Sequence, residues 1–474
     1  MPRIVVIGLT GDGQLGGFET QLGNVAIVIP MVRLLRESLP EAVVETTIQF
    51  TDAFCALHGI ARIDTPRRLR PRAFRGAVWL AQALTELAAA TAAQLLGVAG
   101  RRLARQLLSS RMRRFAEADI VLDLNGDIFP SDVHPARTLL HAIRVATLGR
   151  LGVPVVEFVS SPGPFDTRFR RLVSRLAFSR VSAFANREEL SSELVARLGV
   201  RAPVVSVACP AWLLQPVDEA TSDRLLAAEG LDPSRRPLVG VTLAGYNLES
   251  QRTWTRPKHF RDLERYLPAL RWLLDDLGAS LMLLPHVYRQ NPFVHGSELI
   301  NGPDHDILKN VRNALGVERY GNRVLLVEGK YNSAEAKGMI GRCDFFLSGR
   351  VHAAVAALSQ GVPTVLLAYG HKHRGFARVV GQERFVFDGR DPGALVRLVE
   401  EAWRDRAAIS ASLREAMPRV RQLVAVGFQM VADIAGLPRK SRQRVPDEMA
   451  RSWTERSAGL RGSAARARLS GDAD

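Results

Sequence analysis

Short apolar runs alternate with helical patterns along most of this chain, and that alternation limits its fold more than any other feature. Strands buried on both faces read as continuous apolar runs, and parallel strands need a long crossover between them, usually a helix. The first half contains the runs "RIVVIG", "AVVETTIQF", "DIVLDLNG", "VPVVEFVS", "VSAFANR" and "PVVSVAC". The second half contains "PLVGVTLAG", "SLMLLPH", "RVLLVEG", "CDFFLSG", "PTVLLAYG" and "RFVFD". This pattern predicts a parallel, doubly wound α/β sheet in each half.

The polar, proline-marked segment 215–236 separates the two halves and is predicted to be a linker. Residues 1–214 and 237–437 are then two Rossmann-like domains that face a shared cleft. Residues 438–474 are basic, then small and polar, without hydrophobic periodicity. We expect them to form a mostly disordered tail.

The formal charge of +16 is carried mostly by arginine, and much of it lies in an insertion at about 62–115. The apolar centre of this insertion contains Gln82, Glu86 and Gln94, which argues against a helix that spans a membrane. Two interpretations carry equal weight: a basic amphipathic helical hairpin on an anionic membrane surface, or an ordinary helical insertion with a solvated arginine face. Nucleic acid is not expected as a partner, because no nucleic-acid-binding motif accompanies the charge.

The beginning of the chain, "MPRIVVIGLTGDG", reads as a strand followed by a glycine turn and not as a signal segment. We therefore expect a cytoplasmic protein, with a peripheral position on the inner face of the plasma membrane as the alternative. Cys55, Cys209 and Cys343 are widely spaced in apolar surroundings, so they are predicted to be buried thiols. No metal site is expected, since no cluster has a recognisable ligand spacing.

Polar residues gather where the predicted strands end, and ligands of such sheets bind beyond the carboxyl ends of the strands. In the second half these ends carry His286, Ser348 to Arg350, and Tyr369 to Lys372. The matching segments of the first half are "GLTGDGQLGG", "LNGDIFPSD" and "ANREELSS", which contain Asp12, Asn125, Asp127 and Arg187. We expect these residues to line a substrate site.

The turn at Ser348 and Gly349 indicates a small anion as ligand. It would place helix amides, at the positive end of a helix, against that ligand. Arg350 beside it is suited to two parallel hydrogen bonds with a carboxylate or phosphate. His352, in the first helical turn, can transfer a proton near neutral pH. The pattern predicts a site for a multiply charged anion whose reaction needs a proton.

The stretch "GRCDFFLSGRVHAAVAALSQGVPTVLLAYGHKHRGF" resembles the C-terminal motif of the polysaccharide pyruvyltransferase family. In that motif an aspartate-ended strand, Ser-x-Arg-x-His, a small-residue helix, Gly-x-Pro and Tyr-x-x-Lys follow in order. "YNSAEAKGMIG", "LMLLPH" and "NREELSSELVARLG" are similar to further family segments. The resemblance implies a fold like the two-domain glycosyltransferase B architecture and transfer of pyruvyl from phosphoenolpyruvate to a saccharide. It also implies that residues 1–214 form the acceptor side of the cleft and residues 237–437 the donor side. The first half departs from the family at "LDLNGDIFPSD" and "CPAWLL", and in its large insertion.

This chemistry assigns roles to the candidate residues. Arg350 with the helix amides would bind one anionic group of phosphoenolpyruvate, and Lys372 or Arg187 the other. His352 is the predicted acid that protonates the enol carbon, and His286 is the candidate base. Carboxylates would orient sugar hydroxyls or, alternatively, cap helices; they are Asp12, Asp127 and Glu335. No cofactor is required besides phosphoenolpyruvate as co-substrate.

Two other functions fit the same architecture. In a glycosyltransferase with a nucleotide-sugar donor, Glu335 would hold a ribose, and Arg350 with Lys372 a diphosphate. In an inactive carbohydrate-binding relative, His352 would be dispensable.

Overall fold

We analysed a computed structural model of the chain, which describes residues 1–8, 20–63, 72–125, 129, 135–247, 260–290, 298–439 and 441–471. The chain divides into two compact units. Unit 1 comprises Met1–Gln14, Val32–Ala208 and Gln422–Asp474, and unit 2 comprises Leu15–Met31 and Cys209–Arg421. The chain therefore crosses between the units four times: between Gln14 and Leu15, within α1 (Leu22–Ser38), between Ala208 and Cys209, and within α17 (Arg406–Gly436). No crossing lies in the predicted linker 215–236. That segment instead contains a helix of unit 2, α9 (Glu219–Ala228).

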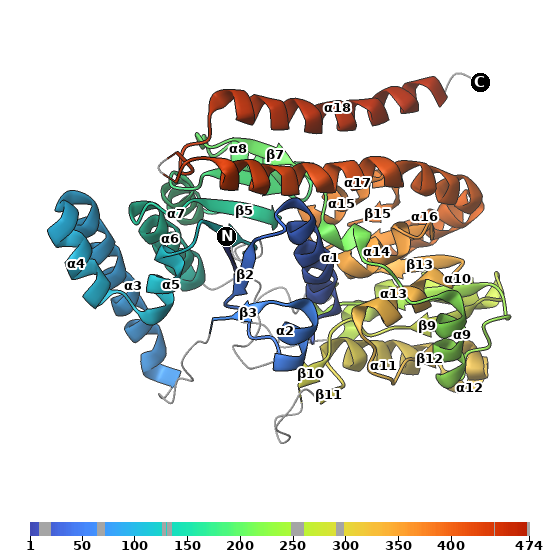
Figure 1. Cartoon of the computed structure of the whole chain (residues 1–474). Coiled ribbons are helices and arrows are strands. Elements are labelled where there is room, and N and C mark those ends of the chain that lie inside the picture. The colour runs from blue at the N-terminus through green and yellow to red at the C-terminus, as the bar shows by residue number, and fades with distance from the viewer. Residues whose placement is uncertain are drawn as a thin grey trace. The chain divides into compact units, whose positions relative to one another are not determined.

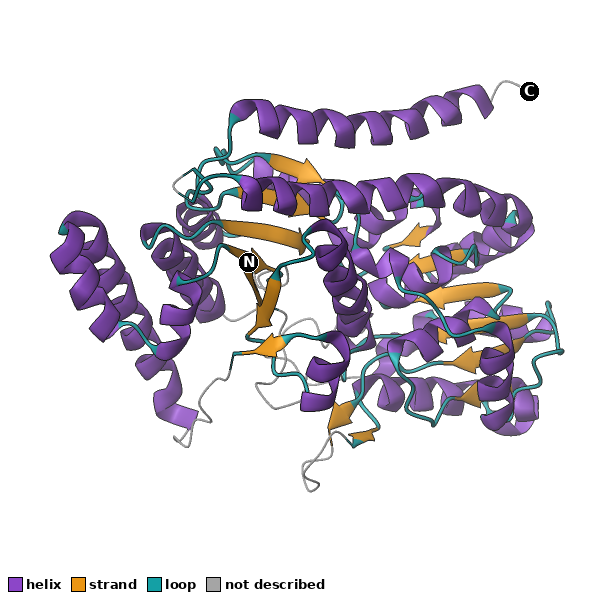
Figure 2. Ribbon diagram, viewed as in Figure 1, coloured by secondary structure: helices purple, strands orange, loops and turns teal. Residues whose placement is uncertain are grey.

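Unit 1 is built on a parallel sheet of seven strands in the order β3-β2-β1-β4-β5-β6-β7. Figure 2 draws the strands of the chain in orange and its helices in purple. Six of these strands coincide with the predicted apolar runs, and the two-residue β3 was not predicted because it is too short to show a pattern. The strands are β1 (Arg3–Ile7), β2 (Val43–Thr46), β3 (Ala61–Arg62), β4 (Ile120–Asp123), β5 (Val155–Ser160), β6 (Ala183–Asn186) and β7 (Val204–Ser206).

The predicted arginine-rich insertion of unit 1 is helical, as expected. It contains α3 (Arg72–Leu95), α4 (Gly97–Leu107) and α5 (Ser110–Ala116). Helices α3 and α4 lie side by side (Figure 1), and Gly100 permits this, since a Cβ there would meet the Ala92 carbonyl oxygen at 2.0 Å. Glu86 is buried and accepts hydrogen bonds from the backbone and side chain of Ser109. No helix in the described part of the chain is long and apolar enough to cross a membrane.

The other helices that cover the sheet of unit 1 connect its strands in chain order. They are α2 (Asp52–His58), α6 (Pro135–Arg150), α7 (Arg168–Phe178) and α8 (Glu189–Ala196). Helix α6 packs against both α3 and α7.

The predicted disordered tail is wrong for the residues that the structure describes. Residues 447–471 form α18 (Asp447–Gly471), which lies beside β7 of unit 1 (Figure 1). Trp453 is buried and donates to Asp433 Oδ2 at 2.7 Å, while the buried Ser457 hydroxyl donates to the Ser206 carbonyl. Arg461 of this helix also forms an ion pair with Glu189. Trp453 and Ser457 are the buried residues in its described part, and this is too little apolar pattern to predict the helix from sequence.

Unit 2 contains a six-stranded parallel sheet in the order β12-β9-β8-β13-β14-β15. All six strands coincide with predicted runs: β8 (Leu238–Thr242), β9 (Ser280–Leu283), β12 (Val324–Leu326), β13 (Phe345–Ser348), β14 (Thr364–Leu367) and β15 (Val386–Phe387). A two-residue antiparallel ladder, β10 (Arg289–Gln290) with β11 (Leu299–Ile300), was not predicted. The remaining helices are α10 (Leu267–Asp275), α11 (Pro303–Leu315), α12 (Val317–Tyr320), α13 (Ser333–Gly341), α14 (Val351–Leu358), α15 (His371–Val379) and α16 (Pro392–Arg404).

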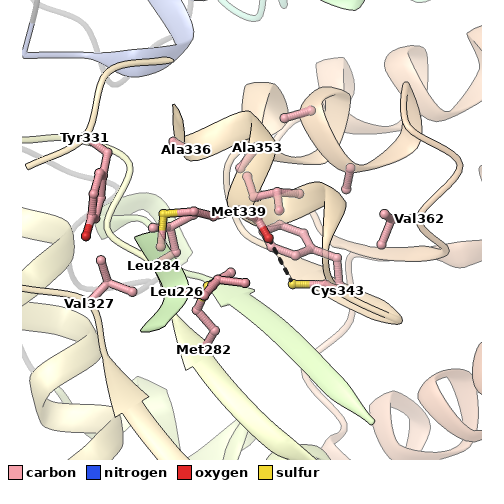
Figure 3. Packing of buried hydrophobic residues seen from close by; sticks show 14 of the residues in the cluster. Leu226, Met282, Leu284, Val327, Tyr331, Ala336, Met339, Cys343, Ala353 and Val362 are labelled. Atoms are coloured by element: carbon pink, nitrogen blue, oxygen red, sulfur yellow. Dashed lines mark hydrogen bonds between the residues drawn. The ribbon is translucent and has the colours of Figure 1, made fainter. Parts of the chain in front are cut away.

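A hydrophobic cluster fills the space between the sheet of unit 2 and helices α9, α13 and α14 (Figure 3). Met282, Met339 and Phe346 are fully buried there, and Cys343 donates to the Met339 carbonyl. Each such side chain contributes roughly 1.5–3 kcal/mol when removed from water. The three cysteines of the chain are free and buried, as predicted. The cluster packs on β8, β9 and β13, and the candidate site lies beyond the C-terminal ends of β9 and β13.

Candidate active site

The turn from β13 into α14 is held by hydrogen bonds that leave little freedom. The buried Ser348 hydroxyl lies 3.1 Å from the Thr242 hydroxyl and donates to the Arg350 carbonyl at 2.7 Å. The Gly349 amide donates to the Thr242 carbonyl, also at 2.7 Å. Only glycine fits at position 349, because a Cβ there would lie 2.1 Å from Asn247 Oδ1. No described side chain caps the N-terminus of α14. Amides at such a helix start can bind an anion, as predicted for this turn.

Arg350 is anchored by Asp304, a residue that was not predicted for the site. Nε of Arg350 donates to Asp304 Oδ2 at 3.0 Å, and Nη2 donates to Oδ1. Asp304 lies in the first turn of α11 and is fully buried. Burial raises the pKa of its carboxyl group, and Arg350 opposes that shift. The two parallel hydrogen bonds that we predicted for a ligand thus go to Asp304, which fixes the orientation of the guanidinium.

His286 is tied to the same carboxylate. Its backbone amide donates to Asp304 Oδ2 at 3.2 Å, so Asp304 brings together two of the predicted residues, from β9 and β13. The imidazole is 6% exposed, and neither of its ring nitrogens has a hydrogen-bond partner in the described part of the chain. Burial and, to a smaller degree, Arg350 lower the pKa of His286 to about 3. The ring is therefore neutral near pH 7.

His352 lies on the first turn of α14, half-buried, and contacts helix α1. A Cβ on Gly23 of α1 would come within 2.5 Å of His352 Nδ1, so the glycine makes room for the imidazole. The ring of His352 also meets the buried ring of Phe376 edge to face, with 6.0 Å between centroids. These two contacts, from α1 and α15, set the direction of the imidazole.

The segment after β14, which includes Tyr369 and the first turn of α15, places a second cation beside an aromatic ring. Lys372 Nζ lies 5.5 Å from the centroid of the Tyr369 ring, and the Tyr369 ring meets that of His373 at 4.3 Å. His373 is fully buried, and its Nδ1 lies 3.3 Å from the Gly370 carbonyl oxygen. Burial, followed by the charge of Lys372, lowers the pKa of His373 to about 3. The buried ring of His373 is therefore neutral near pH 7 and packs against Tyr369.

Glu335 has a structural role in the described contacts. Its carboxylate accepts from the Asn332 amide at 2.8 Å, and the Asn332 side chain accepts from the Ala334 and Glu335 amides. These bonds form a capping box at the start of α13. Capping was one of the two roles considered for this residue.

In unit 1, two of the predicted residues follow β4 and β6, two strands that are separated by β5 in the sheet. Arg187, after β6, is 4% exposed and its Nε donates to the Ser161 hydroxyl at 2.7 Å. Asn125, after β4, donates to Asp123 Oδ1 at 2.8 Å. Val159 in β5 has a φ of +44°, and the register shifts between Phe158 and Ser160, so the chain bulges just before Ser161. Asp12 and Asp127 lie outside the described residues.

Unit 1 contains a buried cluster of three ionisable residues that was not predicted from the sequence. His141 of α6 lies between Asp123 of β4 and Glu157 of β5, with Nδ1 3.5 Å from Asp123 Oδ2 and Nε2 3.3 Å from Glu157 Oε1. All three side chains are 4% exposed or less. They could in principle hold a metal ion. Each ring nitrogen, however, faces a different carboxylate, and this arrangement matches a charged imidazole between two acids better than one ion bound by three ligands.

The raised pKa values of His141 and Glu157 predict that the stability of the protein depends on pH. Burial and the charge of Asp123 raise the pKa of Glu157 to about 7, and the two carboxylates raise the pKa of His141 against its burial. The folded state then binds more protons than the unfolded state, so the contribution of this group to stability falls as the pH rises from about 5 to 8. We expect Glu157→Gln to flatten this slope by up to about 1.4 kcal/mol per pH unit.

Urea denaturation of the wild type and Glu157→Gln at successive pH values measures the difference. An exposed substitution, Glu193→Gln on α8, is the control for surface charge. A constant difference between wild type and Glu157→Gln across this range would contradict the assignment.

The comparisons with known proteins agree with this geometry. The structure is similar to that of the Anabaena protein HepE, solved with UDP and glucose, at 14% identity and a TM-score of 0.53, over 92% of this chain and 99% of that one. It is also similar to S. aureus MnaA, solved with UDP, at 12% identity and a TM-score of 0.53, over 89% and 95%. A glycosyltransferase from Rickettsia africae matches at 10% identity and a TM-score of 0.54, over 92% and 97%.

The two parallel sheets thus define a glycosyltransferase B-like fold, as predicted, within which glycosyltransferases and UDP-GlcNAc 2-epimerases are found. At these identities the likeness concerns the fold alone. The polysaccharide pyruvyl transferase family model matches residues 22–371, and the chain belongs to this family. The protein is therefore a transferase, and the family predicted from the Ser-x-Arg-x-His motif is confirmed.

Proposed function

We propose that the protein transfers a pyruvyl group from phosphoenolpyruvate to a saccharide and forms a pyruvate ketal, in the synthesis of a cell-surface or exported polysaccharide. The observation that carries this proposal is the turn Ser348 to His352, where Arg350 is oriented by Asp304 next to His286 and to uncapped helix amides. Family membership supports the same reaction.

The donor needs cationic partners for a phosphate and a carboxylate. We assign one anionic group to the amides of α14 with Arg350, and the other to Lys372, which lies in the first turn of α15, the helix that follows β14 of the same sheet. Tyr369 holds the ammonium over its ring and thereby limits where it reaches. Arg187, in unit 1, is the alternative partner.

The reaction joins two hydroxyl oxygens of the acceptor to one carbon of the donor. A proton adds to the terminal enol carbon, a sugar hydroxyl attacks the neighbouring carbon, and phosphate leaves as the bond between that carbon and its oxygen breaks. A second hydroxyl closes the ring and releases a proton, so one phosphoenolpyruvate and one diol yield one ketal and one phosphate. We assign protonation of the enol carbon to His352.

His286 is a weaker base than its position suggested. A pKa of about 3 gives little driving force for accepting a proton near neutral pH. Bound phosphoenolpyruvate would bring negative charge near the ring and raise this pKa, so the base role depends on the donor being bound. Its neutral imidazole can otherwise donate a hydrogen bond to a donor oxygen.

Ligand-dependent thermal unfolding tests the donor class without knowledge of the acceptor. Phosphoenolpyruvate at about a hundred times its dissociation constant should stabilise the protein by roughly 2.7 kcal/mol. The companion assay follows release of inorganic phosphate and the mass gain of candidate saccharides. Stabilisation by UDP or GDP, with none by phosphoenolpyruvate, would instead support a nucleotide-sugar glycosyltransferase; binding of saccharides without transfer would support an inactive relative.

Gly23 provides a prediction about His352 that is independent of the donor contacts. Alanine is normally preferred to glycine in a helix by about 1 kcal/mol. Here the new methyl group would displace the imidazole, which it would approach to 2.5 Å. A displacement of this size should reduce the transfer rate by about tenfold to a hundredfold. Phosphoenolpyruvate binding should change little.

The control for Gly23→Ala is Gly459→Ala in α18, where a Cβ meets nothing within 4 Å. Single-turnover rates and thermal unfolding of both variants separate activity from folding. Full activity in a folded Gly23→Ala protein would contradict the role of His352.

A further inference from the structure

Helix α7 of unit 1 is apolar on the face that packs on the protein. It begins at Thr167, whose side chain accepts from the Arg170 amide at 3.2 Å. Val173, Ala177 and Phe178 are buried on its inner face, in a cluster that also contains Phe129 and Phe184. These contacts and the packing on α6 hold the helix in place.

The opposite face of the same helix is apolar as well, although it is exposed. Phe169, Leu172 and Leu176 are 44%, 60% and 62% exposed. Their spacing of three and four residues places them in one row along the helix. Scattered apolar residues are normal on a protein surface, whereas a continuous row usually marks a binding surface.

Arginines border this row. Arg168, Arg171 and Arg175 are exposed, and the helix sequence "RFRRLVSRLAF" contains no acidic residue. Arg171 Nη1 donates to the Phe165 carbonyl at 3.2 Å, at the start of the helix. The buried Arg170 is instead used internally and donates to the Thr138 hydroxyl at 2.9 Å. We call the three exposed apolar residues and these three exposed arginines the α7 outer face.

We propose that the α7 outer face docks on an anionic phospholipid surface. Such a surface takes up an apolar row at the boundary of headgroups and acyl chains, while flanking arginines contact lipid phosphates. The charge on this face is of one sign, and the whole chain carries +16. A soluble polyanion would use the arginines but leave the phenylalanine and leucines in water. The combination therefore favours a lipid surface.

This inference places the membrane contact outside the 62–115 insertion that the sequence pointed to. Helix α7 and helix α3 of the insertion both pack on α6, but they are separate surfaces that can be changed one at a time. The docking itself does not depend on pyruvyl transfer. If the proposed function also holds, the natural acceptor is a lipid-linked saccharide, presented at the surface to which the enzyme binds.

Co-sedimentation of the full-length protein with vesicles of phosphatidylcholine alone, or of phosphatidylcholine with phosphatidylglycerol, tests the proposal. We expect salt-sensitive binding to the anionic vesicles only, reduced on the order of tenfold by Phe169→Ser with Leu172→Ser and Leu176→Ser. Replacing Arg168, Arg171 and Arg175 by glutamine should reduce it at least as much. The matched control is Leu95→Ser with Leu96→Ser, two exposed leucines of the insertion.

A labelled variant tests the site of contact directly. The three natural cysteines are buried, so Leu172→Cys can be labelled with an environment-sensitive dye, and Leu57→Cys on α2, where the leucine is 79% exposed, is the control. We expect a blue shift with anionic vesicles at position 172 alone. Three results would overturn the proposal. Folded α7 variants could bind vesicles as well as the wild type, or only the insertion variant could lose binding. A soluble polyanion could also bind equally well and compete with the vesicles. Transfer of pyruvyl from phosphoenolpyruvate to soluble saccharides is measured separately. It reports on the proposed function and should not change in the α7 variants.

Discussion

Arg350→Ala is expected to abolish stabilisation by phosphoenolpyruvate and to lower the transfer rate by at least a hundredfold to a thousandfold. Loss of one donor to a developing negative charge has this order of effect in enzymes. The substitution also removes the partner of Asp304, whose side chain is 1% exposed. An unpaired buried carboxylate costs about 3–5 kcal/mol, so the variant should also unfold more easily.

A second variant separates the two effects. Arg350→Met combined with Asp304→Asn removes the charge of both partners and keeps an acceptor for the His286 amide, which now donates to Asp304. We expect this pair to recover most of the lost stability but none of the phosphoenolpyruvate binding. Donor binding in the double variant would show that Arg350 only neutralises Asp304 and does not contact the ligand.

The loss of stability caused by Arg350→Ala alone should also become smaller as the pH falls. Burial already raises the pKa of Asp304, and loss of the guanidinium raises it further, so the folded variant takes up a proton more readily than the unfolded chain. Unfolding free energies of the wild type and the variant, measured at acidic and neutral pH, give this slope.

Lys337→Met is expected to stabilise the protein by several kcal/mol at neutral pH. Lys337 of α13 is 3% exposed, and its ammonium group makes one long hydrogen bond, 3.4 Å, to the Trp212 carbonyl. Burial lowers the pKa of this lysine from 10.5 to about 7. The folded state therefore binds fewer protons than the unfolded chain, and the stability of the wild type should rise by about 1.4 kcal/mol per pH unit between pH 7 and pH 10.

Methionine fills a similar volume and does not titrate, so the advantage of Lys337→Met should narrow steadily as the pH rises. Denaturant unfolding across this range measures it, with Lys309→Met, an exposed residue of α11, as the control. A variant less stable than wild type at pH 7, or an advantage that does not depend on pH, would contradict burial of the ammonium. Loss of transfer in a stabilised variant would mean that this lysine serves the reaction.

The strands of both sheets were predictable from sequence because buried parallel strands need continuous apolar runs. Ser348, Gly349, Arg350 and His352 could also be predicted to lie at a strand end, since their spacing is local. The elements that were missed lack such a local signal. Strand β3 has two residues, and α18 is held by the buried Trp453 and Ser457 and by the ion pair of Arg461 with Glu189.

The partners of the candidate residues had to come from the tertiary structure. Asp304 lies 46 residues before Arg350 in the chain, and its position in a helical first turn after proline resembles an ordinary helix start. Asp123, His141 and Glu157 come from two strands and a helix, and their spacing along the chain does not indicate that they meet. The two parallel hydrogen bonds of Arg350, which were predicted for a ligand, are made with Asp304.

The sequence by itself determined the fold class, the family and the strand end that carries the candidate chemistry, because periodicity and short motifs act over neighbouring residues. Only the tertiary structure decided which charges are paired, which histidines are neutral and which apolar residues stay exposed. Those properties depend on burial and on contacts between residues distant in the chain. The row on α7 illustrates this, because its inner and outer faces are both apolar, and only packing on α6 distinguishes them.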